Sequence, residues 1–218
     1  MKRFRDRRHA GELLADVLAE RLGDVEDGIV LALPRGGVPV AERVAARLHL
    51  PLDVFIVRKL GFPGHREYAM GAIASGGITV FNEDAVARLG VDEDILDATV
   101  ESESLELERR ERLYRGERAP LKLSGRDVIL VDDGVATGAS MRAGIEAIKA
   151  HGPSSVVVAV PVAPTSAERD FGKLVDSFIA LSTPTPFQAV GLWYHDFTQT
   201  TDDEVRSLLS GARRDLDS

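Results

Sequence analysis

Five uninterrupted apolar runs, separated by stretches of helical periodicity, dominate the pattern of hydrophobic and polar positions along the chain. The runs predict strands at residues 28–33, 52–57, 127–131, 155–160 and 176–181. Apolar residues recur at helical spacing over residues 8–22, between the first two strands, and over residues 138–150. Strands that are apolar throughout are typical of a sheet covered on both faces. The sequence therefore predicts an α/β fold with a doubly wound, mainly parallel five-stranded sheet flanked by helices.

The remaining segments predict smaller elements around this sheet. Residues 58–81 are rich in glycine and polar groups, which favours a flexible loop followed by a β-hairpin. Residues 92–118 are dense in charge and predict a largely solvated helix. We interpret its charges as a solvent-exposed face rather than as a functional site. Capping boxes at residues 165–168 and 201–204 predict two further helix starts. We expect a single domain over residues 1–218, with a small C-terminal hood at about 184–218.

Composition and charge narrow the classes of function. The chain has no cysteine, which excludes disulfides, thiolate metal sites and a cysteine nucleophile. The net charge of −8 argues against broad binding to nucleic acid. No apolar run reaches the roughly 18 residues that span a bilayer, so we expect a cytoplasmic protein without a membrane partner. The basic residues 1–9 are either a local patch for a small polyphosphate or a solvated arm.

The clearest candidate chemistry follows the apolar strand that ends at Val131. Two carboxylates, Asp132 and Asp133, come directly after this strand, where burial and mutual repulsion make them costly unless hydroxyl donors or a cation share their charge. Thr137 and Ser140 follow at the start of a helix, where exposed amides and the helix dipole favour an anion. One loop thus offers carboxylates for the hydroxyls of a sugar and amides and hydroxyls for its phosphate. The alternative is a plain junction of strand, turn and helix without a ligand.

Other phosphate motifs fit this loop less well. The Walker pattern needs Lys followed by Ser or Thr after its last glycine, but Ala139 follows Gly138 here. Residues 128–138, Val-Ile-Leu-Val-Asp-Asp-Gly-Val-Ala-Thr-Gly, instead resemble the signature with which type I phosphoribosyltransferases bind phosphoribosyl pyrophosphate (PRPP). Overall similarity is greatest to an uncharacterised group of predicted members of that family.

The resemblance assigns roles to the residues of this loop. It implies that Asp132 and Asp133 hold the ribose hydroxyls of PRPP and, through those hydroxyls or water, a Mg²⁺ ion. It implies that the loop after them binds the ribose and its 5-phosphate, through Gly134, Val135, Ala136, Thr137, Gly138, Ala139 and Ser140. The chain departs from the family at Ala136, where a threonine is common, and that position offers only its backbone.

Two other strand ends carry candidate anion-binding groups. Gly36 and Gly37 permit backbone geometries closed to other residues, and Arg35 precedes them. The resemblance implies that these three residues bind pyrophosphate, assisted by Arg58 and Lys59 after the second strand. The alternative for Arg35, Gly36 and Gly37 is an ordinary turn, and the alternative for Arg58 and Lys59 is ordinary surface charge.

Two further segments match the family's lid and base site. Glycines at both ends of residues 61–77 suit a lid that excludes water, and Glu67 within it is a candidate catalytic residue. Trp193 or Tyr194 could stack on a flat ring, with Asp196 accepting an N–H. The alternative for this segment is ordinary packing of aromatic side chains. No role is assigned to His65, Tyr68 or His195.

We therefore expect a Mg²⁺-dependent transferase that moves the ribose 5-phosphate of PRPP to a nucleobase or amine and releases pyrophosphate. The resemblance implies Asp132, Asp133, Arg58, Lys59 and Glu67 as its catalytic set. A hydrolase of PRPP or nucleotides, or a non-catalytic regulatory protein that binds them, remains the alternative. The family commonly forms homodimers, an assembly that the resemblance leaves open for this chain.

Overall fold

A wholly parallel five-stranded sheet forms the centre of the computed structural model, which describes residues 3–62, 65–82, 86–87 and 90–216, the side chains of 65–69 and 213–216 excepted. The strands of this sheet are β1 (Gly28–Ala32), β2 (Leu52–Val54), β6 (Asp127–Val131), β7 (Ser155–Val162) and β8 (Ser177–Ser182). They lie in the order β2-β1-β6-β7-β8. This arrangement confirms the predicted fold class.

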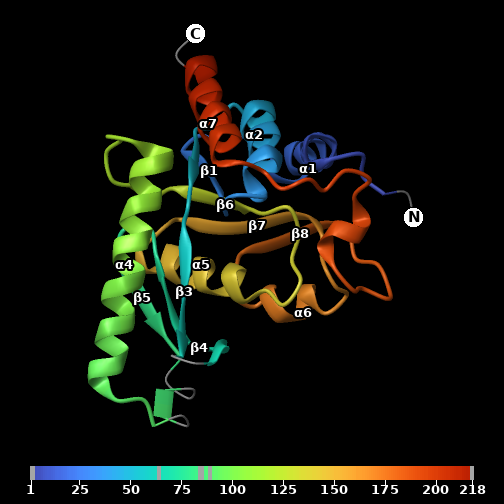
Figure 1. Cartoon of the computed structure of the whole chain (residues 1–218). Coiled ribbons are helices and arrows are strands. Elements are labelled where there is room, and N and C mark those ends of the chain that lie inside the picture. The colour runs from blue at the N-terminus through green and yellow to red at the C-terminus, as the bar shows by residue number, and fades with distance from the viewer. Residues whose placement is uncertain (1–2, 63–64, 83–85, 88–89, 217–218) are drawn as a thin grey trace.

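Helices cover both faces of the sheet (Figure 1). On one face lie α1 (Arg7–Leu22), α2 (Gly37–Leu48) and α7 (Asp202–Leu216), and on the other lie α5 (Ala139–Ala150) and α6 (Ala167–Phe171). Along β1, Val30 and Ala32 pack into the core beneath α1 and α2, whereas Ile29 and Leu31 pack into the core beneath α5. Successive strand residues face opposite sides, so a sheet with two cores needs continuous apolar runs.

At one of the two predicted capping boxes, the threonine caps the helix. Before α7, the amide of Glu204 donates to Oγ1 of Thr201 at 3.1 Å. Before α6, Ser166 occupies the N-cap without a side-chain cap bond. At α1, which the periodicity predicted without its cap, Asp6 accepts from the amide of His9 at 2.8 Å.

The segment after β2 differs most from the prediction. The expected strand 52–57 ends at Val54, and a separate antiparallel sheet follows, made of β3 (Val57–Phe62), β4 (His65–Ala74) and β5 (Ile78–Phe81). The linking residues Phe55 and Ile56 are buried, and their amides donate to the carbonyl oxygen of Ala32 and to Oγ of Ser75. A buried link is as apolar as a strand. The hydrophobic pattern therefore predicted one strand where the structure has β2, a buried link and the start of β3.

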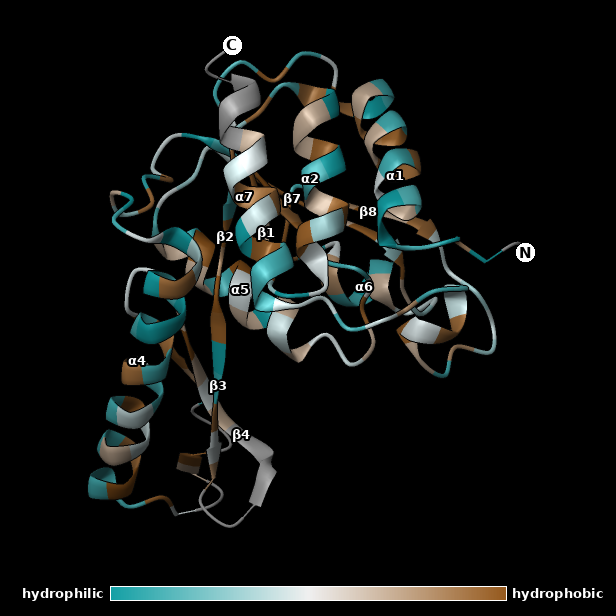
Figure 2. Cartoon of the chain, turned by 45° about the horizontal axis from the view of Figure 1, so that its top comes forward, coloured by the Kyte–Doolittle hydropathy of each residue, from teal (hydrophilic) through white to brown (hydrophobic). Residues whose placement is uncertain are grey.

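The charged segment forms one unbroken helix, α4 (Glu93–Arg115). It stands beside β3 and β4 and is mostly hydrophilic (Figure 2). Leu107 and Tyr114 are its buried residues. Towards the C-terminus, the 3-10 helix η1 (Val190–Trp193) precedes α7, which packs against α2 and β2. Within the described residues, every helix is too short or too polar to cross a membrane.

Candidate functional site

The loops that follow β1 and β6 lie in direct contact. A Cβ atom on Gly36 would collide with Oδ2 of Asp133, and one on Gly37 would lie 2.8 Å from the carbonyl oxygen of Val131 and 2.9 Å from Cα of Asp132. A side chain at Gly37 would strike the backbone of the other loop, and one at Gly36 would displace the carboxylate of Asp133, so the two glycines allow the loops to lie this close. The peptide between Pro34 and Arg35 is cis. The structure thereby brings together the two loops for which the sequence predicted phosphate binding.

Asp133 is held by an arginine from the other end of the sequence. Nε of Arg7 donates to Oδ2 of Asp133 at 2.7 Å, and the two side chains are only 11% and 14% exposed. The guanidinium carbon of Arg7 lies 3.9 Å from the centre of the Phe197 ring, and a terminal nitrogen donates to the carbonyl oxygen of Thr198. A carboxylate accepts about four hydrogen bonds, so this pairing leaves acceptor positions on Asp133 for a ligand.

The two carboxyl groups have unusual acid–base properties. Burial, followed by repulsion from Asp133, raises the pKa of Asp132 well above its usual range, while the amide of Asp133 donates to Asp132 and opposes the rise. Burial also raises the pKa of Asp133, and Arg7 counteracts that effect. Adjacent carboxylates with raised pKa values are a frequent mark of a ligand site, because structural stability alone disfavours them.

The loop from Gly134 to Ser140 divides into a buried anchor and an exposed rim. Val135 is buried, and its amide donates to the carbonyl oxygen of Val162, so this amide serves the fold. Gly138 takes φ +74° at the start of α5, with the ring of Phe171 directly beside it. The rim consists of exposed residues, namely Ala136, Thr137, Ala139 and Ser140. The first amides of a helix lack partners within it, so the rim is suited to an anion.

A cavity of ≈ 650 Å³ opens beside this rim. Thr137, Ala139 and Ser140 line it from α5 and the preceding loop, and Lys59 and Asn82 line it from the antiparallel sheet. Asp132 and Asp133 are not part of its lining. The acidic pair is half-buried between the loops, and the rim alone faces the large cavity.

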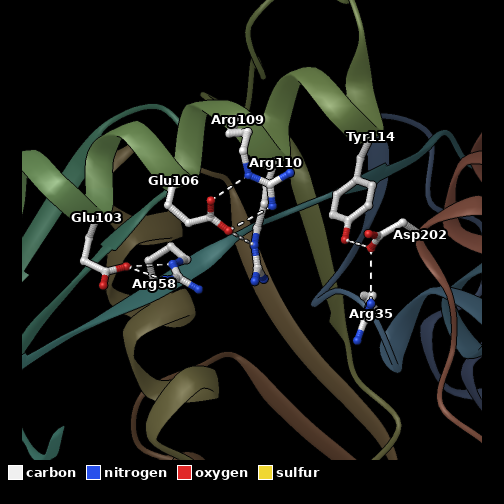
Figure 3. Close-up of polar contacts among 8 residues, drawn as sticks. All are labelled: Arg35, Arg58, Glu103, Glu106, Arg109, Arg110, Tyr114 and Asp202. Carbon is white, nitrogen blue, oxygen red and sulfur yellow. Dashed lines mark hydrogen bonds and ion pairs between the residues drawn. The ribbon is translucent and has the colours of Figure 1, made fainter.

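The predicted cations occupy different surroundings. Arg35 donates to Oδ1 of Asp202 at 3.3 Å, whereas Arg58 is paired with Glu103 of α4 at 2.6 Å (Figure 3). Lys59 lies next to Arg58 on β3 and lines the cavity beside Ser140. The structure thus places Lys59 near the rim and engages Arg58 with α4.

The C-terminal aromatic segment packs directly on the acidic loop. The hydroxyl of Tyr194 donates to the carbonyl oxygen of Asp133, and the Tyr194 ring is 3% exposed between Phe4 and Phe197. This enclosed position differs from the expectation that Tyr194 offers a stacking face, because both of its faces already contact protein. Trp193 is half-buried, and the exposed Asp196 accepts from the amide and hydroxyl of Thr198.

Two expectations lie beyond what the described residues test, namely the catalytic role of Glu67 and the binding of Mg²⁺. The Glu67 side chain belongs to the undescribed part of β4, as do those of His65 and Tyr68. Among the described residues, no group of three or more acidic, histidine or cysteine side chains is arranged to hold a metal ion. Mg²⁺ typically takes one or two carboxylates together with substrate phosphates, and Asp132 and Asp133 fit that donor set.

Several groups near the site were absent from the sequence-based prediction. Arg7 lies 126 residues from Asp133, and no local pattern links the two. Arg109 and Arg110 belong to the charged helix that we interpreted as a solvent-exposed face, yet they share a cavity with Arg35. The one signal that pointed towards Arg7 was the basic character of residues 1–9.

Comparison with known proteins agrees with this geometry. The model of the phosphoribosyl transferase domain family matches residues 5–191. Two Mycobacterium tuberculosis proteins, whose names describe them provisionally as phosphoribosyl transferases, are each 46% identical over 216 residues, or 99% of this chain and 48% of theirs. The chain therefore spans about half the length of these curated relatives.

A solved structure extends the agreement to three dimensions. The protein TT1426 from Thermus thermophilus is 47% identical and superposes with a TM-score of 0.84, covering 95% of this chain and 97% of that one. The likeness in fold therefore extends over nearly the whole chain. The family match over most of the chain, together with the meeting of the two glycine-bearing and acidic loops, shows that this chain belongs to the phosphoribosyl transferase domain family.

Proposed function

We propose that this domain transfers the ribose 5-phosphate of PRPP to a nitrogenous base or amine and releases pyrophosphate. The observation that carries the proposal is the close contact between the loop at Gly36 and Gly37 and the loop at Asp132 and Asp133. A side chain on Gly37 would strike the backbone of the second loop, and one on Gly36 would displace the Asp133 carboxylate. PRPP carries a phosphate at one end of its ribose and a diphosphate at the other. Two anion-binding loops joined at an acidic pair match that distribution of charge and hydroxyl groups.

Each loop has a distinct task in this proposal. Asp132 and Asp133 accept hydrogen bonds from the ribose hydroxyls, and the rim at Thr137 and Ser140 holds the 5-phosphate through amides and hydroxyls. The amide at Gly36, with Arg35, holds the diphosphate, whereas the amide of Gly37 donates to the carbonyl oxygen of Leu33. Lys59 supplies a further positive charge.

The reaction breaks the bond between the anomeric carbon and a diphosphate oxygen and forms a bond from that carbon to the nitrogen of the acceptor. The pair of electrons in the broken bond leaves with pyrophosphate, the nitrogen attacks from the opposite face, and the proton that this nitrogen then loses passes to water or to the departing pyrophosphate. The transition state resembles an oxocarbenium ion, as in other glycosyl transfers. The negative charge of the acidic pair favours that cationic ring, and Arg35 and Lys59 favour the departing anion.

A Mg²⁺ ion fits the oxygen donors of Asp132 and Asp133, either directly or through water and the ribose hydroxyls. When bound, it would neutralise charge on the diphosphate. The acceptor is placed by the half-buried Trp193, at the end of η1, and by Asp196 as an acceptor for an N–H.

The experiment measures pyrophosphate release from PRPP and Mg²⁺ across a panel of nucleobases and amines. The unchanged protein should release pyrophosphate with at least one acceptor. Asp132→Asn combined with Asp133→Asn should weaken PRPP binding by calorimetry at least about a hundredfold, since about two charge-assisted hydrogen bonds are lost. Unchanged affinity in a folded double variant would refute the assignment.

A second candidate function is regulation by binding PRPP or a nucleotide without turnover. The pairing of Asp133 with Arg7 favours it, because one of the two acids is already neutralised by protein. Tight binding of PRPP with no pyrophosphate release for any acceptor would support this candidate over the transferase. Release of pyrophosphate that depends on the acceptor would exclude it.

A further inference from the structure

A small polar cavity of ≈ 160 Å³ lies between the loop after β1 and the side of α4. Its lining comes from three separate segments of the chain: Pro34, Arg35, Arg109, Arg110, Tyr114 and Asp202. Three guanidinium groups and one carboxylate thus surround a space that would hold about five water molecules. In a chain whose net charge is −8, this is a local concentration of positive charge.

The two arginines of α4 are fixed by a single shared carboxylate. Glu106 accepts from Nε of Arg109 at 2.7 Å, from a terminal nitrogen of Arg109 at 3.0 Å, and from Nε of Arg110 at 2.8 Å (Figure 3). Hydrogen bonds from Arg109 and Arg110 lower the pKa of Glu106 to about 2. Each guanidinium has five N–H donors, so one carboxylate leaves most of their donor capacity for another anion.

Arg35 is held from the other side of the same cavity. The hydroxyl of Tyr114 donates to Oδ1 of Asp202 at 2.6 Å, and a terminal nitrogen of Arg35 donates to the same oxygen at 3.3 Å (Figure 3). Burial, followed by the bond to Asp202, raises the pKa of Tyr114 to about 12, so this hydroxyl stays a donor. The short bond fixes Asp202, and the long contact holds Arg35 only weakly.

An ordinary surface ion pair on the same helix looks different. Arg112 and Glu108 approach only to 4.0 Å, with side chains 72% and 60% exposed, and neither belongs to the lining of this cavity. Exposed pairs of that kind contribute little stability. Arg109 and Arg110, in contrast, converge on a cavity that they share with the predicted pyrophosphate loop.

We propose that Arg109 and Arg110 of α4 join Arg35 in a binding site for the diphosphate group of PRPP, an inference that rests on the function proposed above. Guanidinium groups bind phosphate oxygens through paired, planar hydrogen bonds. The diphosphate would lie between α4 and the loop that carries Arg35, and it would add a link to the one that Arg115 of α4 already makes with Asp53 of β2. The charged helix thereby becomes part of the site.

The test compares two probes by calorimetry in the presence of Mg²⁺: inorganic pyrophosphate and ribose 5-phosphate. Arg109→Gln with Arg110→Gln should weaken pyrophosphate binding at least about tenfold, since loss of about 1.4 kcal/mol is tenfold. Ribose 5-phosphate, which lacks the diphosphate, should bind with affinity changed by less than about twofold. Arg112→Gln is the matched control and should leave both affinities unchanged, and circular dichroism checks the folding of every variant.

Three results would overturn the inference. They are an unchanged pyrophosphate affinity in the double variant, equal weakening of both probes, and absence of pyrophosphate binding by the unchanged protein. Failure of the proposed function is distinguishable, because it would appear as absence of ribose 5-phosphate binding in the unchanged protein. The pyrophosphate comparison would still decide the role of the α4 arginines.

Discussion

At the scale of single residues, the two acids of the site both have raised pKa values but have different partners. Asp132 lies beside a second negative charge and accepts from the amide of Asp133, whereas Asp133 is paired with Arg7. A carboxylate kept for binding at the expense of stability is typical of functional sites. The two aspartates are adjacent in sequence, so their comparison is closely matched.

Asp132→Asn should stabilise the fold at neutral pH by roughly 1–3 kcal/mol, because it removes a buried charge and keeps the oxygen that accepts from the Asp133 amide. The raised folded pKa means that the charged form disfavours folding as pH rises through that pKa. The gain in free energy of unfolding should therefore shrink as the pH falls towards the usual pKa of an aspartate, about 3.9. Thermal unfolding measured downward from about pH 7 checks this, and a gain independent of pH would contradict the cause.

Asp133→Asn should destabilise the fold at neutral pH through its partner Arg7, although burial also raises the pKa of Asp133. It leaves the nearly buried guanidinium of Arg7 without its ionic partner, which costs roughly 1–3 kcal/mol. Thermal unfolding in the same buffer series checks this prediction. A melting temperature equal to or above that of the unchanged protein would show that the Arg7 pair contributes no stability.

Arg7→Gln should shift the pH dependence of activity. Burial raises the pKa of Asp133 and Arg7 opposes it, so loss of Arg7 raises the pKa further. If activity needs the carboxylate ionised, the acid limb of the kcat/KM profile should move to higher pH. The exposed neighbour Arg8→Gln is the control and should leave the limb in place. If the acid limb of the kcat/KM profile stays in place in Arg7→Gln, Arg7 does not set the ionisation of Asp133 in the proposed site.

At the scale of elements, the central strands were predictable from sequence, and the links between them were not. Runs such as 128–131 are apolar because each residue enters one of two cores. Phe55 and Ile56 are equally apolar, but they link two sheets, and only tertiary contacts with Ala32 and Ser75 reveal it.

The site itself was partly predictable for a similar reason. The acidic pair and the glycines lie in short, unusual runs that local chemistry explains. Arg7 and Arg110 reach the site through the fold, from segments whose local sequence looks like ordinary solvated charge. Long-range contacts of this kind carry no local signal.

The contact between the two loops gives a prediction at this scale. Gly36 has φ −60°, which any residue adopts, so Gly36→Ala tests the contact with Asp133 alone. Overpacking should cost about 1–3 kcal/mol, and the displaced carboxylate should weaken PRPP binding about tenfold or more, as loss of one good hydrogen bond implies.

Gly211→Ala in α7 is the matched control, because open space surrounds that position. It should be neutral or stabilise slightly, since alanine favours helix. Equal behaviour of the two variants in unfolding and in calorimetry would contradict a tight contact between the loops.

At the scale of the whole molecule, the parallel sheet and the antiparallel sheet enclose the site from different sides. The central sheet supplies both loops that we propose to bind anions, while β3 and α4 contribute Lys59, Arg109 and Arg110 to the lining of the neighbouring cavities. We therefore predict that one molecule with two anionic ends binds across the domain. Ribose 5-phosphate and pyrophosphate should each bind the same site more weakly than PRPP. Because PRPP joins the two covalently, its second contact with the protein is intramolecular.

Competition calorimetry tests this central claim most directly. PRPP is titrated into the protein with Mg²⁺, alone, then after saturation with ribose 5-phosphate, then after saturation with pyrophosphate. We predict that each half weakens the apparent affinity for PRPP and that PRPP binds more tightly than either half. Unchanged PRPP affinity in the presence of either half would contradict binding across the two loops.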